Sequence, residues 1–190
     1  MNKHKAFVIG IAGGSASGKS TFSQALENTL QGVKTHVIHM DSYFKPEQQR
    51  PRACGPVSPI EYLDDNHPLT IDLPKLAVDL AKAATCGKHD IVIVEGLLTL
   101  WDKAVYDQLN LRIFVDCKPD ERIVRRLRRN MEWGLAFDEI SSVYLDLVRY
   151  RHDEFVEPSK WRADFMMNGS NFSATALEMI AEYVKIKTAD

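Results

Sequence analysis

One stretch of the chain decides its fold: Phe7-Val8-Ile9-Gly10-Ile11-Ala12-Gly13-Gly14-Ser15-Ala16-Ser17-Gly18-Lys19-Ser20. Residues 7–12 form an almost wholly apolar run, which predicts a strand buried on both faces. Residues 13–20 match the pattern G-x-x-x-x-G-K-[ST], which a chain of this length contains by chance only about 0.01 times. From Lys19 to about Gln31 the apolar residues share one face, which predicts a helix. This order of strand, loop and helix predicts a phosphate-binding loop; a glycine-rich turn without a ligand is the alternative.

Apolar strands alternate with amphipathic helices along the rest of the chain. We expect strands at 36–39, 91–94, 112–115 and 164–167, and helices at 119–133, 138–156 and 173–187. A further helix, capped by Asp72, is expected to run to about Thr85. This alternation predicts an α/β fold of P-loop NTPase type, with a parallel sheet sandwiched between helices. A length of 190 residues favours a single domain, 1–190.

Composition narrows the class of partner. The 24 basic and 26 acidic residues give a net charge of −2, which supplies no general electrostatic reason to bind nucleic acid or an anionic membrane. No apolar run approaches the length of a membrane span. The three cysteines lie far apart, as is typical of thiols in a reducing compartment. We expect a cytoplasmic protein with a small-molecule substrate, and leave a homo-oligomer open.

Two segments outside the regular alternation are expected to carry function. The first is a proline-rich, aperiodic excursion at about 42–72, and excursions of that length are usually functional. The second is a helical lid at about 119–137, which carries Arg122, Arg125, Arg126, Arg128 and Arg129. Four of these arginines fall on one helix face. That face is either solvated or placed to stabilise charge on a transferred phosphate and to close as a lid.

The phosphate-binding loop and two carboxylates predict ATP and Mg²⁺ as cofactors. Gly13, Gly14, Ser15, Ala16, Ser17, Gly18, Lys19, Ser20 and Thr21 are the candidate ATP-binding residues. Lys19 is expected to neutralise the β- and γ-phosphates, and the Ser20 hydroxyl to ligate Mg²⁺. Asp41 and Glu95 follow neighbouring strands and should converge in front of Ser20. One can hold Mg²⁺ while the other accepts a proton from an attacking hydroxyl; otherwise each is a structural strand-end or turn carboxylate.

Several motifs together resemble the uridine kinase branch of the phosphoribulokinase/uridine kinase superfamily of P-loop kinases. The phosphate-binding loop is followed by Asp41-Ser42-Tyr43-Phe44-Lys45, His67-Pro68 with Asp72, and Glu95-Gly96-Leu97-Leu98. The resemblance continues through Phe114-Val115-Asp116, the run Arg125–Arg129, and Phe155-Val156-Glu157-Pro158-Ser159-Lys160 with Ala163-Asp164. It therefore covers nearly the whole chain.

The resemblance implies roles for particular residues. Asp41 is expected to be the general base, with a second contribution to Mg²⁺ beside Ser20 and Glu95. Substrate binding falls to Asp41, Tyr43 and Asp72, with Asp72 hydrogen-bonding ribose hydroxyls. Lys19, Arg126 and Arg129 are the expected catalytic groups on phosphate.

The chain departs from this family where the base is read. Uridine kinases carry a pyrimidine-reading β-hairpin between the helix that ends near Gly87 and the strand that ends at Glu95, and here Gly87-Lys88-His89 leads directly into that strand. Ile71 replaces an aromatic residue, Val143 replaces a glutamine, and Trp133 and Leu135 replace two lid arginines. We therefore expect weak discrimination among bases and a preference for ribo- over 2′-deoxyribo-compounds.

The predicted function is an ATP-dependent phosphotransferase acting on an alcohol group, first of all the 5′-hydroxyl of uridine or cytidine. One alternative is a kinase of nicotinamide riboside, which Phe44-Lys45-Pro46 also resembles, or of pantothenate or a sugar. The other is an ATP-binding regulatory module without turnover. Trp101, Trp133 and Trp161 could stack on a base, but burial at helix edges is the expected role.

Overall fold

A five-stranded sheet forms the centre of the computed structural model, which describes residues 5–189. All neighbouring strands pair in parallel, in the order β2-β5-β1-β6-β7. The strands are β1 (Phe7–Gly13), β2 (Thr35–His39), β5 (Ile91–Glu95), β6 (Leu111–Asp116) and β7 (Phe165–Asn168). The expected α/β fold with a parallel sheet between helices is confirmed.

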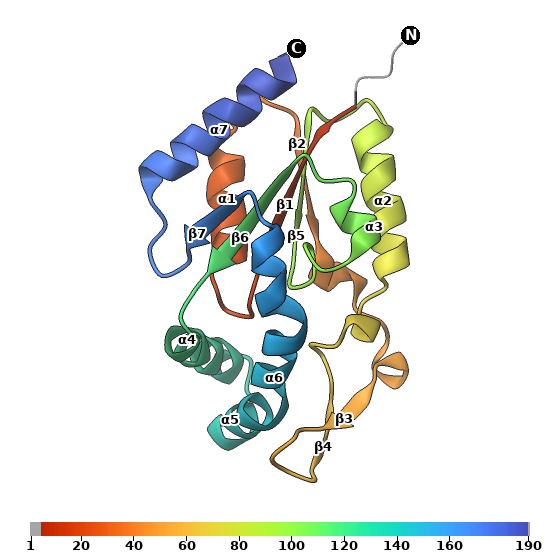
Figure 1. Cartoon of the computed structure of the whole chain (residues 1–190), viewed down its shortest axis with the longest axis vertical. Coiled ribbons are helices and arrows are strands. Elements are labelled where there is room, and N and C mark those ends of the chain that lie inside the picture. The colour runs from red at the N-terminus through yellow and green to blue at the C-terminus, as the bar shows by residue number, and fades with distance from the viewer. Residues whose placement is uncertain (1–4, 190) are drawn as a thin grey trace.

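Helices cover both faces of the sheet (Figure 1). One face carries α1 (Lys19–Thr29) and α7 (Ala174–Ala189), and the other carries α2 (Leu73–Thr85) and α3 (Lys103–Tyr106). Because side chains alternate along a strand, Ile9 and Ile11 pack towards the first layer while Val8 and Ala12 pack towards the second. Both layers are therefore full cores, which explains why the central strands are apolar throughout.

The remaining helices gather beyond the carboxyl ends of the strands, away from the two chain ends (Figure 1). α4 (Pro119–Glu132) leads to a continuous helical run that consists of α5 (Phe137–Val143), a π-helical turn (Tyr144–Val148), α6 (Arg149–Arg151) and a second π-helical turn (His152–Val156). A 3₁₀ segment, Glu157–Arg162, completes the run before β7.

The excursion is folded rather than irregular. It contains an antiparallel hairpin of β3 (Arg52–Cys54) and β4 (Glu61–Leu63), which the sequence did not predict. Short 3₁₀ segments at Met40–Tyr43, Glu47–Gln49 and Pro68–Thr70 flank it. Between α2 and β5, by contrast, residues 86–90 contain no strand. The hairpin of this chain thus precedes α2, whereas the family hairpin was expected after it.

Candidate active site

The predicted phosphate-binding loop connects β1 to α1, with Lys19 and Ser20 as the first helical residues. Its backbone is closely backed by the rest of the protein at Gly14. A Cβ atom at Gly14 would lie 2.5 Å from Nη1 of Arg122 and 3.0 Å from Cε1 of His152. Only glycine leaves these two side chains room, so the loop is braced from behind.

The bracing side chains come from two elements that the sequence did not connect to the loop. Arg122 is buried and its Nε donates to the carbonyl of Cys117 at 3.0 Å, so it is separated from the other lid arginines. His152 is also buried, and its Nε2 lies 3.3 Å from Glu157 Oε2. Burial, followed by the charge of Arg122, holds the pKa of His152 below its usual value, while Glu157 opposes that shift. A neutral imidazole therefore fits behind the loop.

A carboxylate and a hydroxyl meet in front of the loop. Ser20 Oγ lies 3.2 Å from both oxygens of Glu95, as the sequence predicted from their positions at neighbouring strand ends. His39 Nδ1 lies 2.8 Å from Glu95 Oε1, a contact that was not predicted. Oxygen ligands of this kind suit Mg²⁺, which is usually bound by one or two protein carboxylates together with phosphates. The residues present therefore fit the expected ion.

Lys19 is half-buried between groups of both signs. Its pKa is lowered by burial and, to a smaller extent, by Arg129, whereas the charges of Glu95 and Asp41 raise it. Arg129 has a pKa lowered by burial and supported by Asp41. Asp41, which lies in the 3₁₀ turn after β2, thus acts on both cations. The structure brings together Lys19, Asp41, Glu95 and Arg129, as predicted.

Two lid arginines reach the phosphate-binding loop. Arg126 Nη1 donates to Ser15 Oγ at 3.0 Å, and Arg129 Nη2 lies 3.4 Å from the same oxygen. Arg125 turns instead towards the loop after β7, where its Nη1 donates to the carbonyl of Gly169 at 2.9 Å. The arginines of α4 are therefore divided among three tasks, and Arg126 and Arg129 are the pair that faces the loop.

A cavity of about 820 Å³ opens between the loop, the excursion and the lid. Its charged end includes Lys19, Asp41, Arg126 and Arg129. Its far end is formed by residues of the excursion and of α5. These lining residues are Tyr62, Leu63, Asp65, Asn66, Asp138, Glu139, Ser142 and Val143. A second hollow of about 610 Å³ lies on the other side of Lys19, between the start of α1 and residues 169–172. The loop therefore separates two spaces, one on each side of Lys19.

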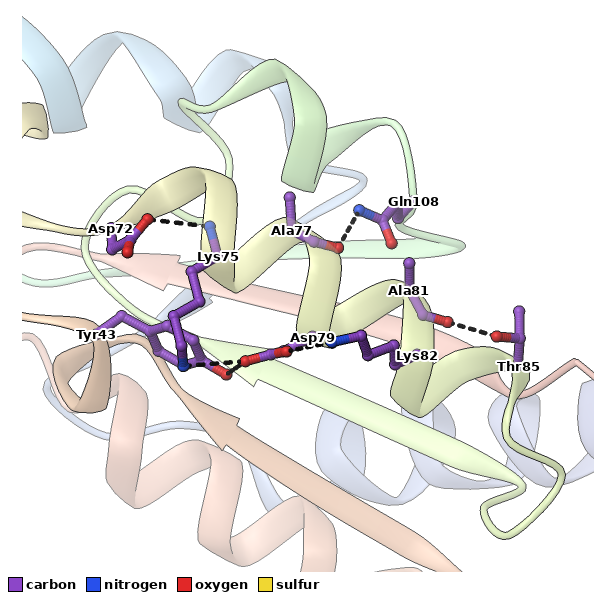
Figure 2. Close-up of polar contacts among 9 residues, drawn as sticks. All are labelled: Tyr43, Asp72, Lys75, Ala77, Asp79, Ala81, Lys82, Thr85 and Gln108. Atoms are coloured by element: carbon purple, nitrogen blue, oxygen red, sulfur yellow. Dashed lines mark hydrogen bonds and ion pairs between the residues drawn. The ribbon is translucent and has the colours of Figure 1, made fainter.

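Tyr43 and Asp72 lie beside this cavity without being among its lining residues. Asp72 accepts a hydrogen bond from the backbone N–H of Lys75 at 3.1 Å and so caps α2 (Figure 2). The Tyr43 hydroxyl donates to Asp79 Oδ2 at 3.3 Å, on the same helix (Figure 2). Both contacts are structural, and the substrate-binding roles of these residues stay predictions.

The expected burial of the tryptophans is wrong for two of the three. The relative exposure is 69% at Trp133 and 76% at Trp161, against 36% at Trp101. Trp133 follows the last residue of α4 and borders the open cavity, so nothing covers its outer face. The Arg129 guanidinium lies 4.9 Å from the centre of its indole ring. Trp133 is thus a cavity residue rather than a core residue.

This fold and this loop, with a lysine, a hydroxyl and a carboxylate at the carboxyl edge of a parallel sheet, define a P-loop nucleotide-binding protein of the kinase type. Comparisons with known proteins agree. The model of the "Phosphoribulokinase / Uridine kinase family" matches residues 8–52 and 66–176. The chain therefore belongs to the phosphoribulokinase/uridine kinase family.

Relatives match along almost the whole chain. A uridine kinase of Clostridium botulinum (strain 657 / Type Ba4) is 34% identical over 197 residues, which cover 94% of this chain and 95% of the relative. A uridine kinase of Lactiplantibacillus plantarum is 30% identical over 208 residues, with 97% of each chain covered. That alignment is longer than the 190 residues of this chain, so the relative has segments that this chain lacks. The structure of a possible uridine kinase from Bacillus stearothermophilus has a TM-score of 0.55 at 20% identity, covering 87% of this chain and 90% of that one.

Family membership makes the protein an ATP-dependent kinase, that is, a phosphotransferase that acts on an alcohol group. The regulatory module without turnover is therefore set aside. Within residues 5–189, none of the helices has both the length and the apolar character needed to cross a membrane.

Proposed function

We propose that the protein transfers the γ-phosphoryl group of ATP, with Mg²⁺, to the 5′-hydroxyl of a nucleoside, uridine or cytidine first. The observation that carries the proposal is that Lys19 and Asp41 line one cavity, which runs from the phosphate-binding loop to the excursion. A phosphate donor and an alcohol acceptor can therefore meet between them. The names of the relatives at 30–34% identity support a nucleoside as the acceptor.

Each group in the site has a defined task in this reaction. Asp41 accepts the proton of the acceptor hydroxyl as the new oxygen–phosphorus bond forms, and the bond between the γ-phosphorus and the bridging oxygen breaks as ADP leaves. Lys19 neutralises charge on the β- and γ-phosphates, and Arg126 and Arg129 stabilise the equatorial oxygens of the transferred group. Ser20 and Glu95 would hold Mg²⁺, which supplies further neutralisation of the phosphate charge when bound.

The loop and lid contacts suit a site that excludes water. Arg126 and Arg129 both meet Ser15, so the lid and the loop share one hydroxyl in the absence of phosphate. Phosphate oxygens can replace that hydroxyl as the partner of both guanidinium groups, because charged acceptors form the stronger hydrogen bonds. The lid is therefore placed to close on the donor.

A panel of acceptors tests the proposal. Release of ADP is measured with uridine, cytidine, a purine riboside, 2′-deoxyuridine, nicotinamide riboside, pantothenate and D-fructose, each at saturating ATP and Mg²⁺. We expect the highest kcat/KM with a nucleoside. Turnover of pantothenate or fructose with none of the nucleosides would refute the proposed acceptor while leaving the kinase activity intact.

A further inference from the structure

The far end of the acceptor cavity is formed by a segment that departs from the family pattern. The family model matches residues 8–52 and resumes at residue 66, so the interruption covers most of the β3–β4 hairpin and the turn after it. From this region Tyr62, Leu63, Asp65 and Asn66 line the cavity. The connection that carries the reading hairpin in uridine kinases is reduced here to residues 86–90. The groups that contact the far part of the acceptor therefore come from elsewhere.

The β3–β4 hairpin is fixed against the helical run that forms the opposite wall. A Cβ atom at Gly55 would lie 1.5 Å from the backbone oxygen of Asp146, so this glycine is in direct contact with the π-helical turn. The Tyr62 hydroxyl donates to Asp146 Oδ2 at 2.7 Å. These two contacts hold the hairpin at a constant distance from the cavity's other wall.

The turn after the hairpin is anchored even more firmly. Asp64 is fully buried, and its Oδ2 accepts from Arg151 Nε at 2.6 Å. The buried Thr70 hydroxyl donates to the Asp64 carbonyl at 2.6 Å, and the Asp64 N–H donates to the carbonyl of Pro51 at 2.8 Å. An ion pair with one buried partner and two hydrogen bonds to the same residue leave this turn little freedom. The residues next to Asp64 are therefore pre-organised.

Of the two polar residues that this turn presents to the cavity, only one is already engaged. Asp65 Oδ1 pairs with Arg50 Nη1 at 3.2 Å. The Asn66 side chain is half-buried, lines the cavity, and makes no hydrogen bond to any residue within 5–189. An amide offers donors and an acceptor together, and leaving them unpaired in a closed site is unfavourable. Asn66 is thus poised for a ligand.

We infer that Asn66 determines acceptor specificity by hydrogen-bonding an amide-like edge at the far end of the acceptor, such as that of uracil, cytosine or a carboxamide. The inference rests on the proposed function. It also replaces the expectation of weak base discrimination, since a pre-organised polar side chain lies in the cavity despite the shortened 86–90 connection. An asparagine can pair with either a carbonyl or an amino group by presenting its N–H₂ or its oxygen.

Asn66→Asp separates these two kinds of pairing because a carboxylate accepts hydrogen bonds but does not donate them. Uracil needs a donor for its carbonyl oxygens, whereas cytosine and a carboxamide each carry an amino group that can donate to a carboxylate. We expect Asn66→Asp to raise the ratio of kcat/KM for cytidine to that for uridine by about tenfold or more. Nicotinamide riboside should gain on uridine in the same direction. Asn66→Ala should lower kcat/KM for all three, with the KM for ATP nearly unchanged.

Asn28→Asp is the matched control, since Asn28 is exposed on α1 and does not line the cavity. Unchanged acceptor ratios in both Asn66 variants would overturn the inference while the proposed function stands. The same holds for an equal loss with every acceptor and with ATP, which would indicate structural damage. If the wild-type protein phosphorylates no nucleoside, the proposed function fails first, and the wild-type panel alone reveals that. D-fructose carries no amide-like edge, so its preference by the wild type also contradicts the inference.

Discussion

Replacing Lys19 by alanine tests the donor side of the site most directly. Lys19 is the first residue of α1, half-buried, with burial lowering its pKa and Glu95 and Asp41 keeping it charged. In the variant the two carboxylates remain while the ammonium group is gone. Phosphate oxygens then meet uncompensated negative charge, and the penalty grows as charge develops during transfer.

The size of the effect follows from the distance and the surroundings. A unit charge at about 4 Å from a phosphate oxygen, at the effective dielectric constant of about 20 typical of protein sites, contributes about 4 kcal/mol. That energy corresponds to a factor of about 10³ in rate. Arg126, Arg129 and the loop N–H groups remain, so we expect kcat/KM for ATP to fall by about 10²–10³-fold.

Initial rates of ADP release at varied ATP, with the best acceptor of the panel at saturation, measure this loss. Lys88→Ala serves as the control, because Lys88 is exposed in the 86–90 connection. Thermal unfolding of both variants should stay close to that of the wild type, since Lys19 contributes little to either core. A Lys19→Ala protein that is folded and as active as the control would refute the assignment of the loop.

Three further predictions concern the base and the brace. Asp41→Asn keeps the side-chain shape but accepts no proton, so kcat should fall by about 10²–10⁴-fold while the KM for ATP changes much less; a change in KM alone contradicts the assignment. Gly14→Ala places a methyl group against Arg122 and His152, and we expect a loss of about 1–3 kcal/mol in unfolding free energy together with weaker ATP binding. Because burial lowers the pKa of His152 from 6.5, the unfolded chain binds that proton more tightly. The stability from this difference is complete above about pH 6.5 and is lost as pH falls through the lowered folded value, so His152→Phe should flatten the acid fall of urea midpoints; an unchanged slope contradicts the neutral imidazole.

The donor side could be predicted from the sequence because its signals are local. The loop residues, the strand before them and the helix after them lie within one short stretch. Ser20 and Glu95 were expected to meet because parallel strands end at the same edge of the sheet, and their 3.2 Å contacts agree. His39 was missed, although the β2–β5 register that pairs it with Glu95 follows from the same rule.

The acceptor side could not be predicted because its contacts join segments that are distant in sequence. Nothing in the excursion announces that Gly55 meets the backbone of Asp146, or that the buried Asp64 pairs with Arg151. The β3 and β4 strands are only three residues each, too short for an alternating pattern to be recognised. Arg122 shares a helix face with Arg126, yet lies behind the loop, because where the helix is placed decides what each arginine meets.

These two kinds of contact also explain how one family fold can accept changes in its acceptor site. Neither core cluster of the described residues includes any residue from 45–70, so the excursion contributes nothing to the two apolar layers. Polar anchors hold it in place instead, chiefly Arg151 on Asp64 and Tyr62 on Asp146. A hairpin can therefore be shortened at 86–90 and another formed at 52–63 without disturbing the sheet or the phosphate-binding loop. Because these segments rest on separate interactions, Asn66→Asp should alter which acceptor is chosen, whereas Lys19→Ala should alter how fast any acceptor reacts.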